Sequence, residues 1–279
     1  MSPSIQYVHA NGLRFAYLEQ GKGPLALLLH GFPDTPQTWD HVRPALAAAG
    51  FRVVTPFTRG YAPTEIPTEE AFDSDTLGRD ALALISALGE DKAFLVGHDW
   101  GASAAYSAAG LEPARLRMLV TAAVPHPAAI FPTPSLLWAV RHFVSLGRPG
   151  AAAKIRAGDF RHIDELVQRW SPSWKVPPDE TLAVKRALRE PGSLEAALGY
   201  YRALTLRLPA SQRVKVSVPA AAIAGTDDAM PTSVYERARK RYTDRYEVIT
   251  MPGSHFLHRQ YPEEFTRHLV RALSAERDR

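Results

Sequence analysis

The sequence predicts an α/β protein in which helices cover a mostly parallel sheet and a helical segment interrupts that sheet. Short runs rich in β-branched and aliphatic residues alternate with segments of helical periodicity through residue 125. From residue 128 to about residue 212 the pattern is helical throughout, and the alternation then resumes. A helical segment between two halves of one sheet is typical of a lid over the carboxyl ends of the strands, where open α/β sheets bind ligands.

The expected strands are apolar runs bounded by turn residues, and Asn11-Gly12 joins the first two as an antiparallel hairpin. Apolar residues recur at helical spacing over residues 76–88, and Gly89 stands where that helix should stop. We expect strands at residues 5–9, 13–19, 26–30, 51–55, 93–96, 118–122, 218–224 and 246–251, and further helices at residues 233–242 and 262–274.

These patterns divide the chain into three parts. Residues 1–127 and 213–279 are expected to form the two parts of the core, and residues 128–212 the helical lid. The lid segment is rich in Trp, Tyr and Arg and contains several prolines. Because proline lacks the N–H group that a helix interior needs, these prolines break the helical pattern.

The composition narrows the class of protein. The chain has 279 residues, of which 46% are hydrophobic and 22% charged, as in a globular protein with one large core. Its net charge is +4, but the basic residues are scattered, so no nucleic-acid partner is expected. The absence of cysteine excludes disulfides and thiol nucleophiles. No apolar run has membrane-spanning length and no export leader is evident, so we expect a cytoplasmic protein without a membrane partner. A homo-oligomer is left open.

The most informative stretch is a sharp turn, Gly97-x-Asp99-x-Gly101, between an apolar run and a helix of small residues. Such a strand-to-helix turn lifts its middle residue onto an exposed tip above the sheet, and the flanking glycines make room for the tight backbone. In the common version of this turn the tip is serine. Here it is Asp99, so covalent chemistry would proceed through a carboxylate, which attacks alkyl carbon far more usefully than a carboxyl ester.

Reactive residue types also follow the other predicted strands. Asp227 and Asp228 follow the strand that ends near residue 224, and His255 follows the last strand. The spacing Gly-x-x-Asp favours Asp228 as the acid and leaves Asp227 to cap a turn. His258 is the alternative to His255 as the base.

Five motifs occur together in one order: His30-Gly31-Phe32-Pro33, Arg59-Gly60-Tyr61, the turn around Asp99, Gly225-x-x-Asp228 and Gly253-x-His255. With these motifs the chain resembles α/β-hydrolases of the epoxide hydrolase branch, which share the aspartate nucleophile with haloalkane and haloacetate dehalogenases. The resemblance implies an eight-stranded, mostly parallel sheet with a helical cap inserted after strand 6. It also implies that the order nucleophile, acid, histidine is that of a catalytic triad.

The resemblance implies a reaction in two steps. Asp99 attacks an epoxide carbon and forms an ester, and His255, oriented by Asp228, then activates the water that hydrolyses the ester. The backbone N–H groups of Phe32 and Trp100 would stabilise the oxyanion of the second step. The expected partners are a small-molecule epoxide or organohalide and water, and neither a cofactor nor a metal is expected.

Epoxide hydrolases usually supply two lid tyrosines that donate to the departing oxygen. Tyr201 matches the first, because it precedes Arg202 in a helical segment. At the second position this chain has His142, and an imidazole N–H can also donate a hydrogen bond. The substrate pocket is expected to include four further residues: His30, Pro33, Asp34 and Trp138.

Three alternatives remain beside epoxide hydrolysis. A dehalogenase would use the same nucleophile. However, Phe32 stands where haloalkane dehalogenases carry a side-chain amide, and residues 102–106 lack the arginines with which haloacetate dehalogenases grip a carboxylate. A non-catalytic binding protein would have no need for nucleophile, acid and base together. A carboxylester hydrolase is disfavoured because no serine occupies the turn.

Overall fold

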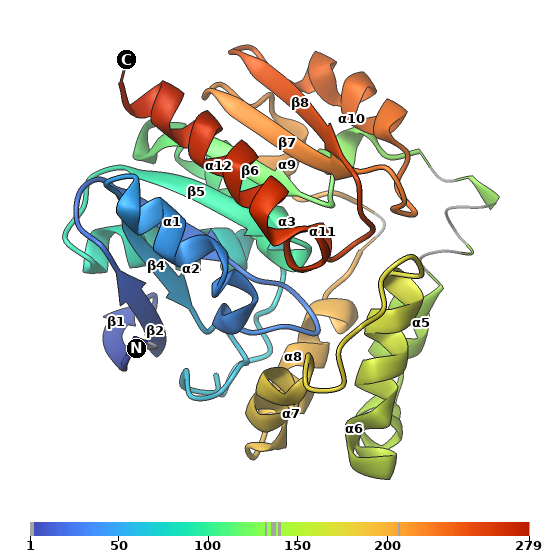
Figure 1. Ribbon diagram of the computed structural model, residues 1–279. Coiled ribbons are helices and arrows are strands. Elements are labelled where there is room, and N and C mark those ends of the chain that lie inside the picture. The colour runs from blue at the N-terminus through green and yellow to red at the C-terminus, as the bar shows by residue number, and fades with distance from the viewer. Residues whose placement is uncertain (1–2, 132, 135–137, 139–140, 206, 279) are drawn as a thin grey trace.

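The computed structural model describes residues 3–278 except 132, 135–137, 139–140 and 206. Its centre is an eight-stranded sheet in the order β1-β2-β4-β3-β5-β6-β7-β8 (Figure 1). Strands β1 and β2 form an antiparallel hairpin, β2 pairs antiparallel with β4, and the remaining pairs are parallel. The predicted fold class is therefore confirmed.

The strands are β1 (Ile5–Ala10), β2 (Leu13–Gln20), β3 (Leu25–Leu29), β4 (Arg52–Pro56), β5 (Ala93–His98), β6 (Leu116–Ala122), β7 (Ala220–Gly225) and β8 (Tyr246–Met251). The helices around the sheet are α1 (Val42–Ala48), α2 (Ser74–Ala87), α3 (Trp100–Leu111), α9 (Ala210–Arg213), α10 (Thr232–Ala238), α11 (Leu257–Gln260) and α12 (Pro262–Arg277). Each predicted strand is present, and no bound differs from the prediction by more than two residues.

Successive residues of the central strands face opposite layers, as the period of two in a strand requires. Ala26 and Leu28 belong to one buried layer together with residues of α1 and α12, whereas Leu25, Leu27 and Leu29 belong to the other, with α2 and α3. All five residues of β3 are buried. Burial on both faces explains why the central strands read as continuous apolar runs rather than as alternating ones.

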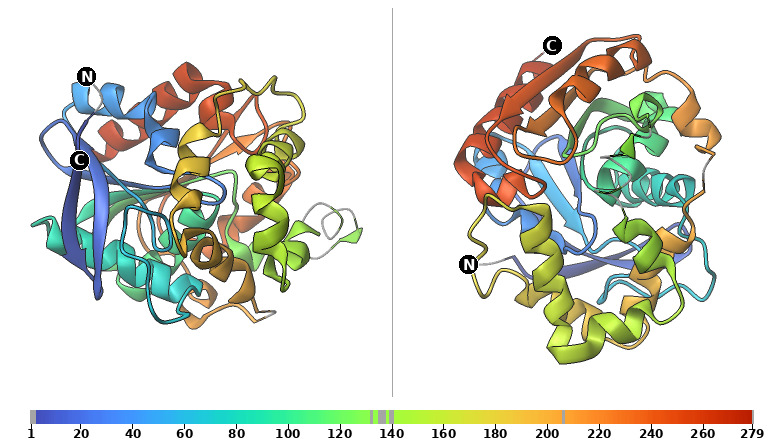
Figure 2. Two further views of the ribbon diagram at one scale, coloured as in Figure 1. Left: turned by 90° about the horizontal axis from the view of Figure 1, so that it is seen from below. Right: turned by 90° about the vertical axis from the view of Figure 1, so that its right-hand side faces the viewer.

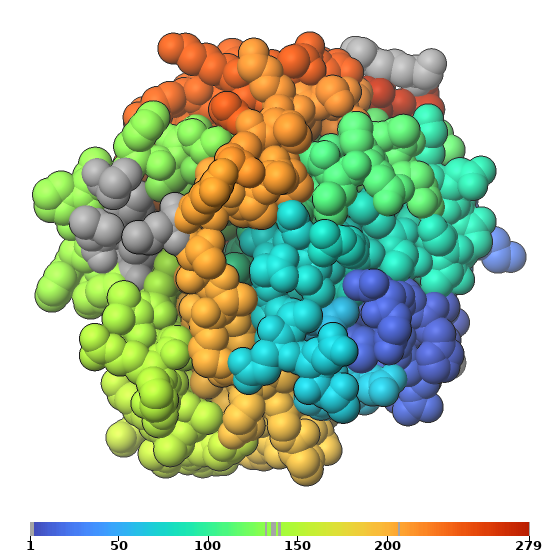
Figure 3. Space-filling view, turned by 180° about the vertical axis from the view of Figure 1, so that it is seen from behind, coloured from blue at the N-terminus to red at the C-terminus, as the bar shows by residue number. Residues whose placement is uncertain are grey.

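The helical insert follows β6 and lies apart from the sheet (Figures 1 and 2). Its helices are α5 (His142–Gly147), α6 (Ala151–Trp170), α7 (Leu182–Arg189) and α8 (Ser193–Arg202). Helix α6 is broken at residues 157–160, where Gly158, Asp159 and Phe160 have positive φ. Figure 3 shows the returning segment, in orange, crossing one face of the molecule between the insert and the core. Helix α9 contacts the core, because Gln212 Nε2 donates to the backbone oxygen of Ser103 at 3.0 Å.

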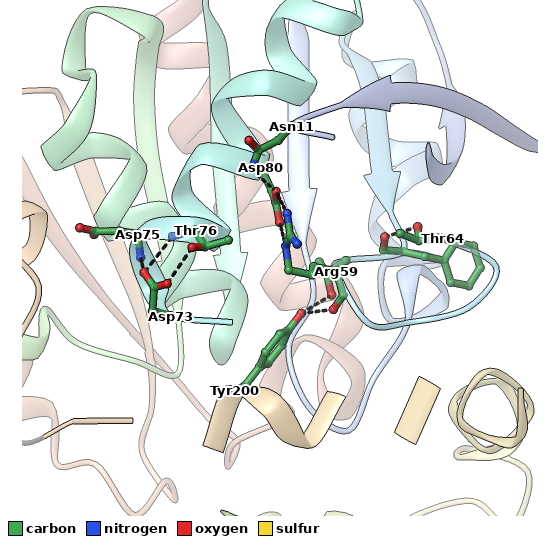
Figure 4. A network of polar contacts seen from close by, with 10 residues as sticks. Asn11, Arg59, Thr64, Asp73, Asp75, Thr76, Asp80 and Tyr200 are labelled. Atoms are coloured by element: carbon green, nitrogen blue, oxygen red, sulfur yellow. Dashed lines mark hydrogen bonds and ion pairs between the residues drawn. The ribbon is translucent and has the colours of Figure 1, made fainter. Parts of the chain in front are cut away.

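A buried polar network attaches the insert to the core (Figure 4). Arg59 donates two hydrogen bonds of 2.7 Å to the carboxylate of Asp80 on α2, and Asn11 in the β1–β2 turn donates to the same carboxylate at 2.6 Å. The hydroxyl of Tyr200 on α8 donates to the backbone oxygen of Arg59 at 2.5 Å. Gly60 has φ +84° and lies so close to Ala196 of α8 that a Cβ would be 3.0 Å from its carbonyl carbon. The Arg59-Gly60-Tyr61 motif is thus a docking turn for α8.

Within the described part of the chain, no helix combines the length and the apolar character needed to cross a membrane.

Candidate active site

Asp99 is the single residue between β5 and α3, and its backbone is strained. Its φ of 53° and ψ of −120° lie in a region that residues other than glycine rarely adopt. Close backbone contacts explain why the residues on either side of this turn are glycines. A Cβ on Gly97 would lie 2.2 Å from the carbonyl oxygen of Gly101, and a Cβ on Gly101 would lie 2.3 Å from that of Leu29. The turn therefore holds the Asp99 side chain in one position above the carboxyl end of β5.

The structure brings Asp99, Asp228 and His255 together from the ends of three strands. Nε2 of His255 lies 3.3 Å from Oδ2 of Asp99, and Nδ1 of His255 lies 3.7 Å from Oδ2 of Asp228. Asp227 turns away, since its Oδ2 accepts from Ser173 at 2.9 Å. His258 is also separate from this group of charges: its Nε2 bonds to Thr38. Between the alternatives left open by the sequence, the geometry favours Asp228 and His255.

The charges around the site shift the pKa of His255 and that of Asp99. Burial alone would lower the pKa of His255, but the carboxylates of Asp228 and Asp99 on either side raise it to about 10. Burial alone would raise the pKa of Asp99, but His255 and the backbone N–H of Phe32 hold it below its usual value. Near neutral pH the site thus holds an imidazolium between two carboxylates.

The loop after β3 supplies a hydrogen-bond donor to Asp99. The backbone N–H of Phe32 donates to Oδ1 of Asp99 at 2.8 Å. A Cβ on Gly31 would lie 2.2 Å from that Oδ1 and 2.6 Å from the backbone nitrogen of Trp100, so both nitrogens border the carboxylate. The two backbone nitrogens predicted to form an oxyanion hole thus lie beside the Asp99 carboxyl group.

A cavity of about 710 Å³ opens above these residues. Asp99, Asp228 and His255 lie on its wall, together with residues of the core and of the insert. Most of the wall is apolar and aromatic, which suits a small organic molecule. Among the lining residues are Phe72, Trp100, Phe143, Trp170, Leu204 and Met230.

Tyr201 packs directly over the oxyanion loop and the turn. Its ring makes edge contacts with Phe32 and with Trp100, both at 5.3 Å between centroids. Burial, and after it the charge of Asp99, raises the pKa of Tyr201 well above its usual value. Its buried hydroxyl forms no hydrogen bond of ordinary geometry within the described residues, and the nearby indole N–H of Trp100 is a donor only. The hydroxyl proton is therefore left without an acceptor beside the nucleophile.

His142 begins α5 and lines the cavity. Its ring lies 4.6 Å from that of Trp170 and 6.4 Å from that of Tyr201, measured between centroids. Of the two expected lid donors, His142 therefore lines the cavity, whereas Tyr201 is buried next to it and is not part of the wall.

The prediction for the substrate pocket needs correction, because four of its residues lie outside the cavity wall: His30, Pro33, Asp34 and Trp138. His30 is turned into the core, where its Nε2 accepts from the backbone N–H of Thr58 at 3.1 Å. Pro33 is buried beside Phe32. Trp138 is 70% exposed, with the guanidinium of Arg141 over its ring at 4.2 Å.

Asp34 does not reach the cavity that His255 lines. Its Oδ1 accepts from Arg259 at 3.1 Å. Among the described residues, Asp34, His98 and His258 form a buried group whose spacing could hold a metal ion.

Residues of the wall that the sequence interpretation missed include Phe72, Phe143 and Ser103. Phe143 follows His142 directly, and this adjacency was the one signal that could have identified it.

The chain matches the α/β hydrolase fold family over residues 24–260 and belongs to it. It is 29% identical over 268 residues to the AB hydrolase superfamily protein YfhM of Bacillus subtilis, which covers 92% of this chain and 93% of that one.

The resemblance to epoxide hydrolases is confirmed by further relatives. Epoxide hydrolase A of Mycobacterium tuberculosis is 28% identical over 320 residues, with 98% of each chain covered. The crystal structure of epoxide hydrolase VrEH1 from Vigna radiata superposes with a TM-score of 0.82 at 26% identity, covering 98% of this chain and 99% of that one.

Proposed function

We propose that this protein hydrolyses an epoxide to a vicinal diol through an ester on Asp99. The observation that carries the proposal is the position of the Asp99 carboxylate. One oxygen accepts from the N–H of Phe32 at 2.8 Å, and the other lies 3.3 Å from Nε2 of His255. A nucleophile, a base and an oxyanion donor thus converge on one carboxyl group.

In the first step an oxygen of Asp99 attacks an epoxide carbon, and the bond from that carbon to the ring oxygen breaks. The departing oxygen takes a proton from the Tyr201 hydroxyl, with His142 as a second hydrogen-bond donor, and the Tyr201 phenolate regains a proton from solvent. The missing acceptor for the Tyr201 proton supports this role, because an epoxide oxygen would supply one. Residues 128–212 act as the lid that brings both donors to the substrate.

In the second step His255 removes a proton from water, which attacks the carbonyl carbon of the Asp99 ester. The oxyanion that forms on Asp99 is stabilised by the N–H groups of Phe32 and Trp100. When it collapses, the bond from the carbonyl carbon to the substrate oxygen breaks, the diol leaves with the proton of the new carboxyl group, and Asp99 is again a carboxylate beside the protonated His255. Ester formation removes the negative charge of Asp99, which is one of the two charges that raise the pKa of His255. Loss of that charge lowers the pKa of His255, so the ring can release its proton to solvent. His255 is then neutral and can act as the base of the second step.

A dehalogenase would also use Asp99, but the side chain next to the turn is the apolar ring of Phe32, packed on Tyr201. A halide leaving group would find no side-chain amide there. The arrangement of donors supports a departing oxygen rather than a halide.

A single turnover in ¹⁸O-labelled water tests the proposal. The label should enter the carboxylate of Asp99, because water attacks the ester carbonyl carbon and not the substrate. His255→Gln should accumulate an ester whose mass equals that of protein plus epoxide, and Asp99→Ala should form none. If the folded wild-type protein places the label only in the diol, direct attack of water on the epoxide replaces the ester mechanism.

A further inference from the structure

The three loops that carry Phe32, Asp99 and His255 meet a second time behind the active site. Asp34 follows Phe32 by two residues, His98 precedes Asp99, and His258 follows His255 by three. Asp34 is 2% exposed, and the two histidines are fully buried. These three side chains, which we call the rear cluster, each offer one nitrogen or oxygen atom within 4.8 Å of the other two.

Each member of the rear cluster has one buried polar atom without a hydrogen-bond partner among the described residues: Oδ2 of Asp34, Nδ1 of His98 and Nδ1 of His258. Their other polar atoms are engaged. Oδ1 of Asp34 accepts from Arg259, Nε2 of His98 bonds to the backbone oxygen of His255 at 2.9 Å, and Nε2 of His258 bonds to Thr38. Buried polar atoms without partners are rare in folded proteins, and three in one place need a common explanation.

The hydrogen-bond chemistry of His98 is fixed by its partner. A carbonyl oxygen only accepts, so the His98 proton must be on Nε2, and Nδ1 presents a lone pair. Oδ2 of Asp34 also presents lone pairs only. Burial lowers the pKa of His98 to about 4 and that of His258 well below its usual value, so both rings are neutral. The cluster therefore contains two acceptors facing a histidine that carries a single proton.

We propose that the rear cluster binds one water molecule and that its residues position His255 for the second step; this inference rests on the proposed function. Atoms within 4.8 Å of one another share a point no more than about 2.8 Å from each, since 4.8 Å divided by the square root of three is 2.8 Å. That is an ordinary hydrogen-bond length. The water donates to Oδ2 of Asp34 and Nδ1 of His98 and accepts from Nδ1–H of His258, while the Thr38 hydroxyl donates to Nε2 of His258.

The alternative occupant is a divalent metal ion, and the observations favour water. The spacing of the three atoms, at most 4.8 Å, admits either occupant, because ligand atoms around a zinc ion at about 2.0–2.2 Å also lie within that limit. A positive charge already lies beside Asp34, because Nη1 of Arg259 is 3.1 Å from Oδ1; the same guanidinium also pairs with Glu180. A dication would add positive charge beside a guanidinium, whereas water adds none.

The functional consequence follows from the bond between His98 and the backbone of His255. The rear cluster holds the base loop against the nucleophile turn, and the ring of His98 also packs on that of His255 at 4.9 Å. Ester formation requires Asp99 and the lid donors, but ester hydrolysis requires an accurately placed His255 imidazole. Loosening the cluster should thus slow the second step and leave the first nearly unchanged.

The kinetic test compares His258→Phe with His258→Gln by rapid quench, measuring ester formation and ester hydrolysis separately. His258→Phe removes the donor to the water and should slow hydrolysis about tenfold or more, as small displacements of catalytic groups do, with ester formation within about twofold. His258→Gln keeps an N–H donor and should recover most of the rate. His126→Phe is the matched control: it also removes a fully buried imidazole, but one bonded to Ala128, and should leave the ratio of the two rates unchanged.

Equal slowing of both steps in folded His258→Phe, or no slowing of hydrolysis, would overturn the positioning role. Two measurements do not depend on catalysis. Nitrogen-15 NMR of wild-type protein should show His98 protonated at Nε2 and His258 at Nδ1; the opposite tautomer of His258 would overturn the water assignment. Equilibrium dialysis against Zn²⁺ should show no stoichiometric binding, and one equivalent bound by wild type but not by His258→Phe would identify a metal site instead. Absence of any ester in wild type would count against the proposed function alone.

Discussion

Replacing Tyr201 by phenylalanine removes a hydroxyl that is buried without an acceptor for its proton. We expect the variant to be more stable than the wild type and less active. The gain in stability follows because folding strips water from the hydroxyl and provides no acceptor for its proton among the described residues. The loss follows because, in the proposed first step, that hydroxyl supplies the proton for the epoxide oxygen.

The magnitudes can be estimated from the structure. A buried polar group without a partner costs about 1–3 kcal/mol, and Tyr201 is only 4% exposed, so most of this penalty should be relieved. For chains of about 150–250 residues each kcal/mol raises Tm by about 2–4 °C. Loss of a general acid typically slows a reaction by about 10²-fold or more.

Tyr200 is a matched control on the same helix. It is also fully buried, but its hydroxyl donates to the backbone oxygen of Arg59 at 2.5 Å. Tyr200→Phe removes the same atom, breaks that bond and leaves a carbonyl without its donor. It should therefore be destabilising by about 1 kcal/mol or more, so the two neighbouring tyrosines should shift stability in opposite directions.

The assays are urea unfolding for stability and rapid quench for ester formation, on both variants and the wild type. Lower stability of Tyr201→Phe would refute the assignment of an unpartnered hydroxyl. Wild-type ester formation in that variant would refute its role as the acid, whatever the stability result.

Three further predictions concern the turn, the docking network and pH. Gly31→Ala places a Cβ 2.2 Å from Oδ1 of Asp99, so ester formation should fall about 10²-fold while circular dichroism stays unchanged; retained activity would contradict the geometry. Arg59→Met leaves the buried carboxylate of Asp80 unpaired, so urea unfolding should show a loss of about 3–5 kcal/mol, and adding Asp80→Asn should restore part of it. Because the pKa of His255 is raised to about 10, its stabilisation is complete below its unfolded pKa near 6.5 and is lost as pH rises through about 10. Urea unfolding over that range should show a smaller decline in Asp99→Asn, and an equal decline would contradict the pairing.

The fold and the reactive residues were predictable because their signals are local. Gly97 and Gly101 are required by backbone contacts within one turn, so the motif identifies Asp99 as its tip. The apolar runs of the central strands are a direct result of burial on both faces. Parallel strands then bring the reactive residues together, because the carboxyl ends of these strands lie at one edge of the sheet.

The cavity wall was not predictable because its geometry depends on distant partners. His30 and Asp34 are close to Phe32 in sequence but do not line the cavity. His30 accepts a hydrogen bond from Thr58 in the core, and Asp34 accepts one from Arg259. Trp138 belongs to the lid segment but lies on its outer surface. No periodicity or motif in the sequence predicts the positions of these side chains, because each position depends on a hydrogen bond or packing contact between segments that are remote in sequence.

The network through Arg59 has a practical consequence for engineering. It links Asn11, in the first hairpin, to Asp80 of α2 and onward to Tyr200 of the lid (Figure 4). The attachment of the helical insert to the core can therefore be weakened from a surface turn that lies outside the cavity wall. Substituting Asn11 would loosen that attachment while Asp99, Asp228 and His255 keep their places.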